Sequence, residues 1–154
     1  MPSDRKPPLL LAEDEEDDIA IITQAIQKVN FEFAVEVVRN GEDAMHYLAG
    51  EGPFADRERF PLPFLILLDL KMPGWNGYEF LQWYHFRPDL HHIPVVVLTS
   101  SGMDDDVIKV HALGAKSFLL KPTDFPSMQE LMRLLMQYWE LLKNTVVIQR
   151  ENPE

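Results

Sequence analysis

The amino-acid sequence predicts an α/β fold, a doubly wound parallel sheet of five strands with helices on both faces. Short apolar runs alternate five times with segments in which apolar residues recur every three or four positions. Apolar residues make up 46% of the 154 residues and charged residues 25%, which is ordinary for a globular domain. We therefore expect one domain over residues 8–143, between an N-terminal tail, 1–7, and a C-terminal tail, 144–154.

The first half of the chain predicts two strands and two helices. Leu9 to Ala12 is a continuous apolar run, as in a strand that is buried on both faces. From Ile19 to Val29, apolar residues at steps of three and four mark one face of a helix. Phe33 to Val38 predicts the second strand. Asn40 is a suitable N-cap for the next helix, and the glycines and proline of 50–53 end it.

The second half of the chain repeats this pattern after a long, proline-bearing loop over 51–63. Each apolar run again predicts a strand, and each amphipathic segment predicts the helix that follows it. The expected strands are 64–68, 95–98 and 117–120, and the expected helices are 76–86, 104–114 and 125–143.

Composition excludes several classes of function. The 25 acidic residues outnumber the 14 basic ones, and a net charge of −11 argues against nucleic acids and anionic membranes as partners. The absence of cysteine excludes disulfides, thiol catalysis and Cys-ligated metal sites. The N-terminus has no apolar segment typical of a signal peptide, and the longest apolar run, 64–68, is too short to span a membrane. We therefore expect a cytoplasmic protein.

Polar side chains follow four of the five predicted strands. Glu13 and Asp14 come after the first strand, Asp69 after the third, Thr99 after the fourth and Lys121 after the fifth. Because crossovers between parallel strands are right-handed, all strands end at the same edge of the sheet, where ligands of open α/β sheets bind. The sequence therefore predicts one site built from these residues.

Three carboxylates at one edge repel one another and need a positive partner. Mg²⁺ suits them because it prefers hard oxygen ligands, and Lys121 supplies a second cation. Thr99 offers a hydroxyl that can donate a hydrogen bond. A carboxylate such as Asp69, with a metal, a lysine and a hydroxyl beside it, is a suitable acceptor of a phosphoryl group.

These residues resemble the response-regulator receiver domains of two-component signalling. The matching motifs are the Glu13-Asp14 pair, Asp69 in LILLDLKMPGWNG, Thr99 in VVVLTS and Lys121-Pro122. Thr99 and Lys121 lie 30 and 52 residues after Asp69, which is similar to the spacing in chemotaxis-type receivers. The resemblance covers residues 8–142 and implies a flavodoxin-like fold with strand order 2-1-3-4-5.

The resemblance also implies a role for each metal-site residue. A phosphohistidine on a sensor histidine kinase would phosphorylate Asp69. Asp14 and Asp69 would bind Mg²⁺ directly, together with the backbone carbonyl of Lys71, and Glu13 would act through water. Mn²⁺ or Ca²⁺ are the implied substitutes for Mg²⁺. Such a domain is a signalling protein rather than an enzyme, with only metal-assisted self-phosphorylation and slow dephosphorylation.

The remaining implied roles concern the response to phosphorylation. Lys121 would bridge to the phosphoryl group, and Thr99 would move towards it. Phe118, at the family's switch-aromatic position, would then turn inward and shift a two-state equilibrium. Lys71 and Ser101 occupy positions that tune the lifetime of the acyl phosphate. Two departures stand out, since Glu13 replaces the commoner Asp and Phe118 replaces the frequent Tyr.

Two other fold-compatible functions fit the sequence less well. A phosphatase of the haloacid-dehalogenase type needs a second carboxylate two residues after its nucleophile, and that position is Lys71. A flavodoxin-like FMN carrier would bind phosphate after the first strand, where residues 13–18 are all acidic. Within this run we expect Asp17 and Asp18 to be the solvated start of a helix.

The interpretation of the partners rests on a narrower resemblance. The sequence resembles regulators of phytochrome-type histidine kinases in three features. These are the expected receiver domain without an output domain, the loop over 51–63 and the Tyr138-Trp139 pair. A generic phosphorelay or motility receiver with another kinase is the alternative, as is a receiver-like constitutive binding module. Leu134 and Leu141 lie outside the apolar stripe of the last helix, which makes a homodimer a candidate assembly.

Overall fold

The structure is a computed structural model that describes residues 6–29, 32–100 and 104–150, with side chains for all of these but 104–105 and 142–150. Contacts within the chain divide it into two compact units. The first contains residues 1–19 and 32–121, and the second contains residues 20–31 and 122–154. The single domain expected over 8–143 stays a prediction.

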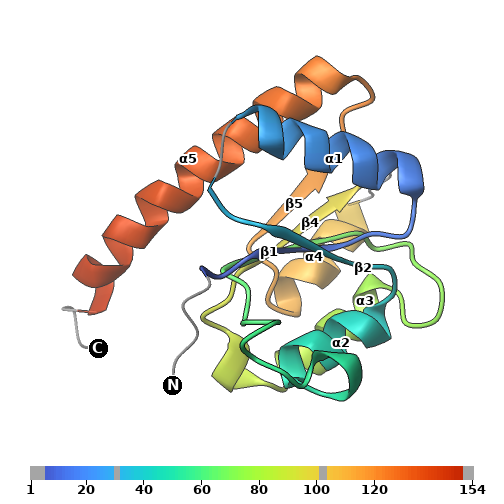
Figure 1. Cartoon of the computed structure of the whole chain (residues 1–154), viewed down its shortest axis with the longest axis vertical. Coiled ribbons are helices and arrows are strands. Elements are labelled where there is room, and N and C mark those ends of the chain that lie inside the picture. The colour runs from blue at the N-terminus through green and yellow to red at the C-terminus, as the bar shows by residue number, and fades with distance from the viewer. Residues whose placement is uncertain (1–5, 30–31, 101–103, 151–154) are drawn as a thin grey trace. The chain divides into compact units, whose positions relative to one another are not determined.

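The first unit contains a five-stranded parallel sheet in the order β2-β1-β3-β4-β5, which confirms the predicted fold class (Figure 1). β1 lies between β2 and β3. The order in which the chain adds strands to the sheet therefore reverses between β1 and β3. Sites of doubly wound sheets form at such a reversal, at the carboxyl ends of the strands. The strands are β1 (Leu9–Ala12), β2 (Val35–Val38), β3 (Leu65–Leu68), β4 (Val95–Thr99) and β5 (Ser117–Leu120).

Helices alternate with the strands along the chain, as predicted. They are α1 (Glu16–Lys28), α2 (Gly41–Ala49), α3 (Gly77–His85), α4 (Asp104–Ala112) and α5 (Phe125–Arg150), with short 3₁₀ turns at Gly52–Phe54 and Pro88–Leu90. The last helix continues seven residues beyond its expected end at Lys143, because no glycine or proline interrupts the chain before Pro153. Among the described residues, no helix has both the length and the apolar character needed to cross a bilayer.

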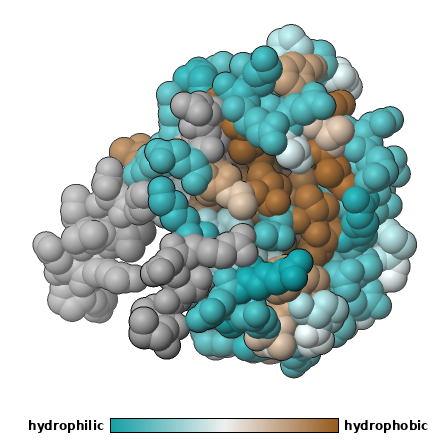
Figure 2. All heavy atoms as spheres, viewed as in Figure 1, coloured by the Kyte–Doolittle hydropathy of each residue, from teal (hydrophilic) through white to brown (hydrophobic). Residues whose placement is uncertain are grey.

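The core of the first unit lies between the sheet and the helices α2, α3 and α4, which occupy one side of it (Figure 1). Alternate strand residues such as Leu10, Ile66 and Val97 face this core, as the two-residue period of a strand requires. Tyr47, Phe80 and Tyr84 are its largest fully buried side chains. Hydrophobic side chains also reach the surface around the edge strand β2, in the middle of the face that Figure 2 shows.

The loop over 51–63 is packed against α2 by an arginine that caps this helix. Nη1 of Arg57 donates to the carbonyls of Tyr47 at 2.8 Å and Phe60 at 3.1 Å, and Nη2 donates to the carbonyl of Leu48 at 2.7 Å. Carbonyls at a helix C-terminus lack helical partners and carry partial negative charge, which favours a cation there. The rings of Phe54 and Phe60 pack on each other and on Tyr47.

We expect Arg57→Ala to lower the free energy of unfolding by about 1–3 kcal/mol, because buried carbonyls lose a charged donor. Arg57→Lys should recover only part of this, since an ammonium lacks the planar fork of donors. Urea unfolding of purified variants measures both effects. Arg59→Ala is the matched control, with an expected loss of about 0.5 kcal/mol from its contact with the Phe60 ring. Equal losses at Arg57 and Arg59 would contradict the capping role.

Candidate functional site

The polar residues after the strands converge at one edge of the sheet in the first unit. Hydrogen bonds that continue the sheet ladders fix their backbone. The amide of Asp69 donates to the carbonyl of Ala12 at 3.0 Å, and the amide of Lys121 donates to the carbonyl of Thr99 at 2.7 Å. The sheet therefore fixes the backbone positions from which the side chains of Asp69 and Lys121 extend.

Three carboxylates meet at this edge. Oxygen atoms of Glu13, Asp14 and Asp69 all lie within 4.8 Å of one another. Glu13 is 1% exposed and Asp69 is 5% exposed, so both carboxylates are removed from water. Burial of several like charges is costly unless cations compensate them. The arrangement therefore requires positive charge.

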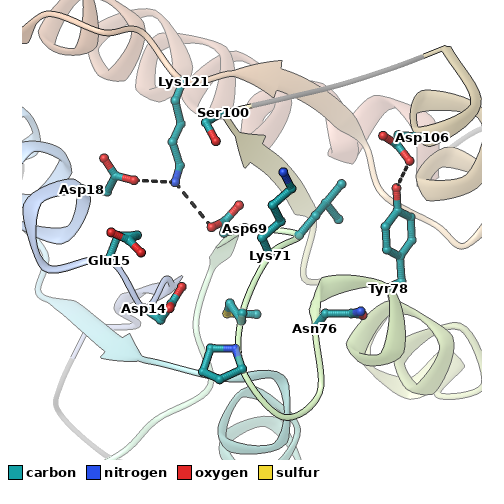
Figure 3. A pocket seen from close by; sticks show the side chains of 13 residues that line it. Asp14, Glu15, Asp18, Asp69, Lys71, Asn76, Tyr78, Ser100, Asp106 and Lys121 are labelled. Atoms are coloured by element: carbon teal, nitrogen blue, oxygen red, sulfur yellow. Dashed lines mark hydrogen bonds and ion pairs between the residues drawn. The ribbon is translucent and has the colours of Figure 1, made fainter.

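Lys121 supplies part of that charge. Its Nζ lies 2.6 Å from Oε1 of Glu13, 2.8 Å from Oδ2 of Asp18 and 3.5 Å from Oδ2 of Asp69. Figure 3 shows this ammonium between Asp18 and Asp69. Burial lowers the pKa of Lys121, but the hydrogen bonds to Asp18 and Glu13, together with the charges of Glu13 and Asp69, outweigh burial and raise the pKa above its usual value. The lysine is therefore charged at all physiological pH values.

One lysine does not fully compensate the site. The pKa of Glu13 is raised to about 7, because burial and, to a smaller extent, the charge of Asp69 raise it by more than the hydrogen bond from Lys121 lowers it. A carboxyl group with such a pKa gains a proton near neutral pH, in contrast to an ordinary glutamate. A second cation at this edge would favour the charged form of Glu13.

Two buried polar atoms of this site have no hydrogen-bond partner in the described part of the chain. They are Oδ1 of Asp69 and Oγ1 of Thr99. Unsatisfied buried polar atoms are rare in folded proteins and frequently mark functional sites. A cation would satisfy the carboxylate oxygen of Asp69, and an anionic oxygen would accept a hydrogen bond from the Thr99 hydroxyl. The donor set of this site thus fits a hard divalent cation together with an anionic ligand.

An open cavity of about 800 Å³ gives access to the site. Asp14, Asp69 and Lys121 line it, as do Lys71 and Ser100, which are exposed (Figure 3). The opposite wall contains a hydrogen bond from the Tyr78 hydroxyl of α3 to the carboxylate of Asp106 in α4. A small anionic group therefore has direct access to Asp69 from solvent.

The loop between β3 and α3, which carries Lys71, is fixed to the start of α2. The amide of Gly41 donates to the carbonyl of Trp75 at 2.8 Å, and the amide of Trp75 donates to Oε1 of Glu42 at 2.8 Å. A Cβ atom at position 41 would lie 2.7 Å from the Trp75 carbonyl oxygen, so this close approach requires glycine. The loop thus has a defined position beside the cavity.

Asp18 differs from its expected role. Its side chain is 32% exposed and pairs with Lys121, so the expectation of a purely solvated residue at the helix start is wrong. The ion pair joins residues 103 positions apart in the sequence. The run of acidic residues that contains Asp18 does not indicate which of them pairs with a distant lysine. Its neighbour Asp17 is exposed, as expected. Phe118 is half-buried against the core, and Ser101 lies outside the described residues.

Comparisons of the sequence and of the structure with known proteins both find response regulators. The sequence model of the response regulator receiver domain matches residues 9–133. Response regulator Rcp1 of Synechocystis sp. is 33% identical over 141 residues, which cover 90% of this chain and 94% of Rcp1. The crystal structure of the Mn(2+)-bound form of Rcp1 has a TM-score of 0.77 at 32% identity and covers 87% of this chain and 94% of its own.

Two further solved structures are similar over most of their length. The phosphorylated cyanobacterial phytochrome response regulator RcpA has a TM-score of 0.79 at 32% identity, covering 86% of this chain and 93% of RcpA. The bacteriophytochrome response regulator RtBRR has a TM-score of 0.71 at 40% identity, covering 84% of this chain and 76% of its own. Together with the sheet order, these matches show that the chain belongs to the response regulator receiver-domain family of two-component signalling.

Proposed function

We propose that Asp69 accepts a phosphoryl group from a phosphohistidine of a sensor histidine kinase. The observation that carries this proposal is the buried carboxylate of Asp69. One of its oxygens has no hydrogen-bond partner among the described residues, and the other lies 3.5 Å from the charged Nζ of Lys121. A carboxylate oxygen attacks phosphorus, so that an O–P bond forms while the P–N bond breaks. The bonding electrons leave with the imidazole of the donor histidine, which a proton then neutralises.

A divalent cation completes the proposed site. Asp14, Asp69 and the Lys71 carbonyl would hold Mg²⁺ directly and Glu13 would hold it through water, with Mn²⁺ or Ca²⁺ as substitutes. The close carboxylate oxygens support this assignment, as does the Mn(2+)-bound form of the similar protein Rcp1. When bound, the cation supplies positive charge to the phosphoryl oxygens and to the surrounding carboxylates.

Residues of the chain itself would convert phosphorylation into a conformational change. The Lys121 ammonium neutralises one phosphoryl oxygen, and the Thr99 hydroxyl, whose Oγ1 has no partner in the described part of the chain, donates to another. Movement of Thr99 towards the phosphoryl group would let the half-buried Phe118 turn inward. The phosphoryl group then acts as the ligand that shifts a two-state equilibrium.

We propose a phytochrome-type histidine kinase as the phosphoryl donor, because the similar proteins RcpA and RtBRR are phytochrome and bacteriophytochrome response regulators. A second copy of the chain is the proposed partner for Leu134 and Leu141 of α5, which are 48% and 63% exposed.

Intact mass spectrometry after incubation with acetyl phosphate tests the proposed function. We expect a gain of one phosphoryl group that requires Mg²⁺ and that peptide mapping places on Asp69, with acetate as the leaving group. Histidine kinases of phytochrome type and of non-phytochrome type, each phosphorylated on its own histidine, then serve as alternative phosphoryl donors. If no donor transfers a phosphoryl group and calorimetry detects no Mg²⁺ binding, the chain is a receiver-like constitutive binding module instead.

A further inference from the structure

Within the described ranges, Lys121 has three carboxylate partners at unequal distances. Its Nζ is 2.6 Å from Glu13 and 2.8 Å from Asp18, but 3.5 Å from Asp69. An ammonium has three N–H donors, and the two short contacts occupy two of them. Because the ammonium lies between Asp18 and Asp69 (Figure 3), a closer approach to Asp69 takes it away from Asp18.

The two short contacts differ in what happens when Lys121 leaves them. The side chain of Glu13 is 1% exposed, so without Lys121 its charge would be buried and uncompensated. The side chain of Asp18 is 32% exposed, so water can replace the ammonium there. Asp18 is therefore the partner that Lys121 can exchange for another anion.

We propose that Asp18 holds Lys121 in a resting position and competes for it with the phosphoryl group on Asp69. Asp18 is thus a positioning residue, which acts on the phosphoryl group only through Lys121. The inference rests on the proposed phosphoryl-acceptor function and adds to it. It makes the free energy of the phosphorylated state depend on Asp18 of α1 through the contact of this residue with Lys121.

Asp17 provides a matched control for this inference. It belongs to the same first turn of α1 and carries the same charge, but its side chain is exposed and the ion pairs described for Lys121 do not include it. Asp17→Asn and Asp18→Asn remove the same charge from the same helix N-terminus. Any difference between them reports the contact with Lys121 rather than the general electrostatic field.

The experiment measures the affinity of the metal-loaded protein for beryllofluoride, an anionic noncovalent mimic of a phosphoryl group, by calorimetry in excess Mg²⁺. We expect the dissociation constant of the D18N variant to be roughly three- to tenfold lower than that of the D17N variant, which corresponds to the loss of one competing charged hydrogen bond. Asp18→Glu, which restores a carboxylate on this turn, should return the dissociation constant towards the wild-type value.

The controls separate this inference from the proposed function. If the wild-type protein binds no beryllofluoride and takes no phosphoryl group, the proposed function fails and the role of Asp18 fails with it. If the wild-type protein binds and D18N equals D17N or binds more weakly, the competition by Asp18 is refuted while the function stands. Tighter binding by D18N alone, reversed by D18E, supports the inference.

Discussion

Asp69→Asn is expected to fold and to take no phosphoryl group from acetyl phosphate or from a histidine kinase. A neutral amide lacks the negative charge and the nucleophilic oxygen that form the acyl phosphate. Intact mass after incubation with acetyl phosphate and Mg²⁺ measures the loss, and the wild-type protein and the D17N variant serve as positive controls. A phosphoryl group found on the D69N variant would mean that another residue is the acceptor.

The same substitution is expected to stabilise the metal-free protein by about 1 kcal/mol, because functional sites retain interactions that oppose folding. Asp69 is 5% exposed, its Oδ1 has no partner among the described residues, and its charge raises the pKa of Glu13. Asn removes one of the repelling charges and keeps a similar shape. Urea unfolding in EDTA should show a higher midpoint, whereas a lower midpoint would mean that the charge of Asp69 stabilises the fold.

Lys121→Met is expected to lower the free energy of unfolding of the metal-free protein by about 3–5 kcal/mol at pH 8–9. The side chain of Lys121 is 6% exposed and compensates Glu13, Asp18 and Asp69. Methionine fills a similar volume but leaves the buried carboxylates uncompensated. Urea unfolding in EDTA measures the loss. Lys116→Met, at an exposed position, is the control, with an expected change below about 0.5 kcal/mol.

The cost of Lys121→Met should depend on pH in a defined direction. Glu13 has a raised pKa of about 7 in the folded protein, so the folded state binds a proton before the unfolded state does as the pH falls. Loss of Lys121 removes a contact that lowers this pKa, so protonation relieves the variant at a higher pH than the wild type. The protonation of Lys121 itself adds no pH dependence between pH 6 and 9, because its folded pKa is raised and its unfolded pKa is about 10.4.

The difference in stability between wild type and K121M should therefore shrink as the pH falls from 9 towards 6. A difference that stays constant over this range would show that Lys121 stabilises the fold by packing of its alkyl chain rather than by its charge.

The elements of the fold follow from patterns within single segments of the sequence. Strands β1 and β5 begin and end at the residues that the apolar runs predict, and Asn40 caps α2 as its side chain suggests. Because all parallel strands end at one edge, the same patterns also predict that Asp69 and Lys121 approach each other. Short-range periodicity and one topological rule are sufficient for this much.

Long-range partners of individual charged side chains could not be predicted in this way. Asp18 pairs with Lys121 across 103 positions, and the carboxylate of Glu42 binds an amide 33 positions away. Arg57 caps a helix that precedes it in the chain. Each contact depends on a side-chain conformation and a backbone approach that no local pattern encodes. The sequence pattern predicts too early an end for α5, because only the absence of glycine and proline indicates that the helix continues beyond Lys143.

The two hydrogen bonds of Trp75 have a consequence for ligand affinity. Its carbonyl accepts from Gly41 and its amide donates to Glu42, so the segment that carries Lys71 is ordered before any ligand arrives. Fixing a backbone residue costs about 1–2 kcal/mol of conformational entropy. Here folding absorbs that cost, and a cation bound by the Lys71 carbonyl would not have to order the loop again. Such preorganisation converts more of the interaction energy into affinity.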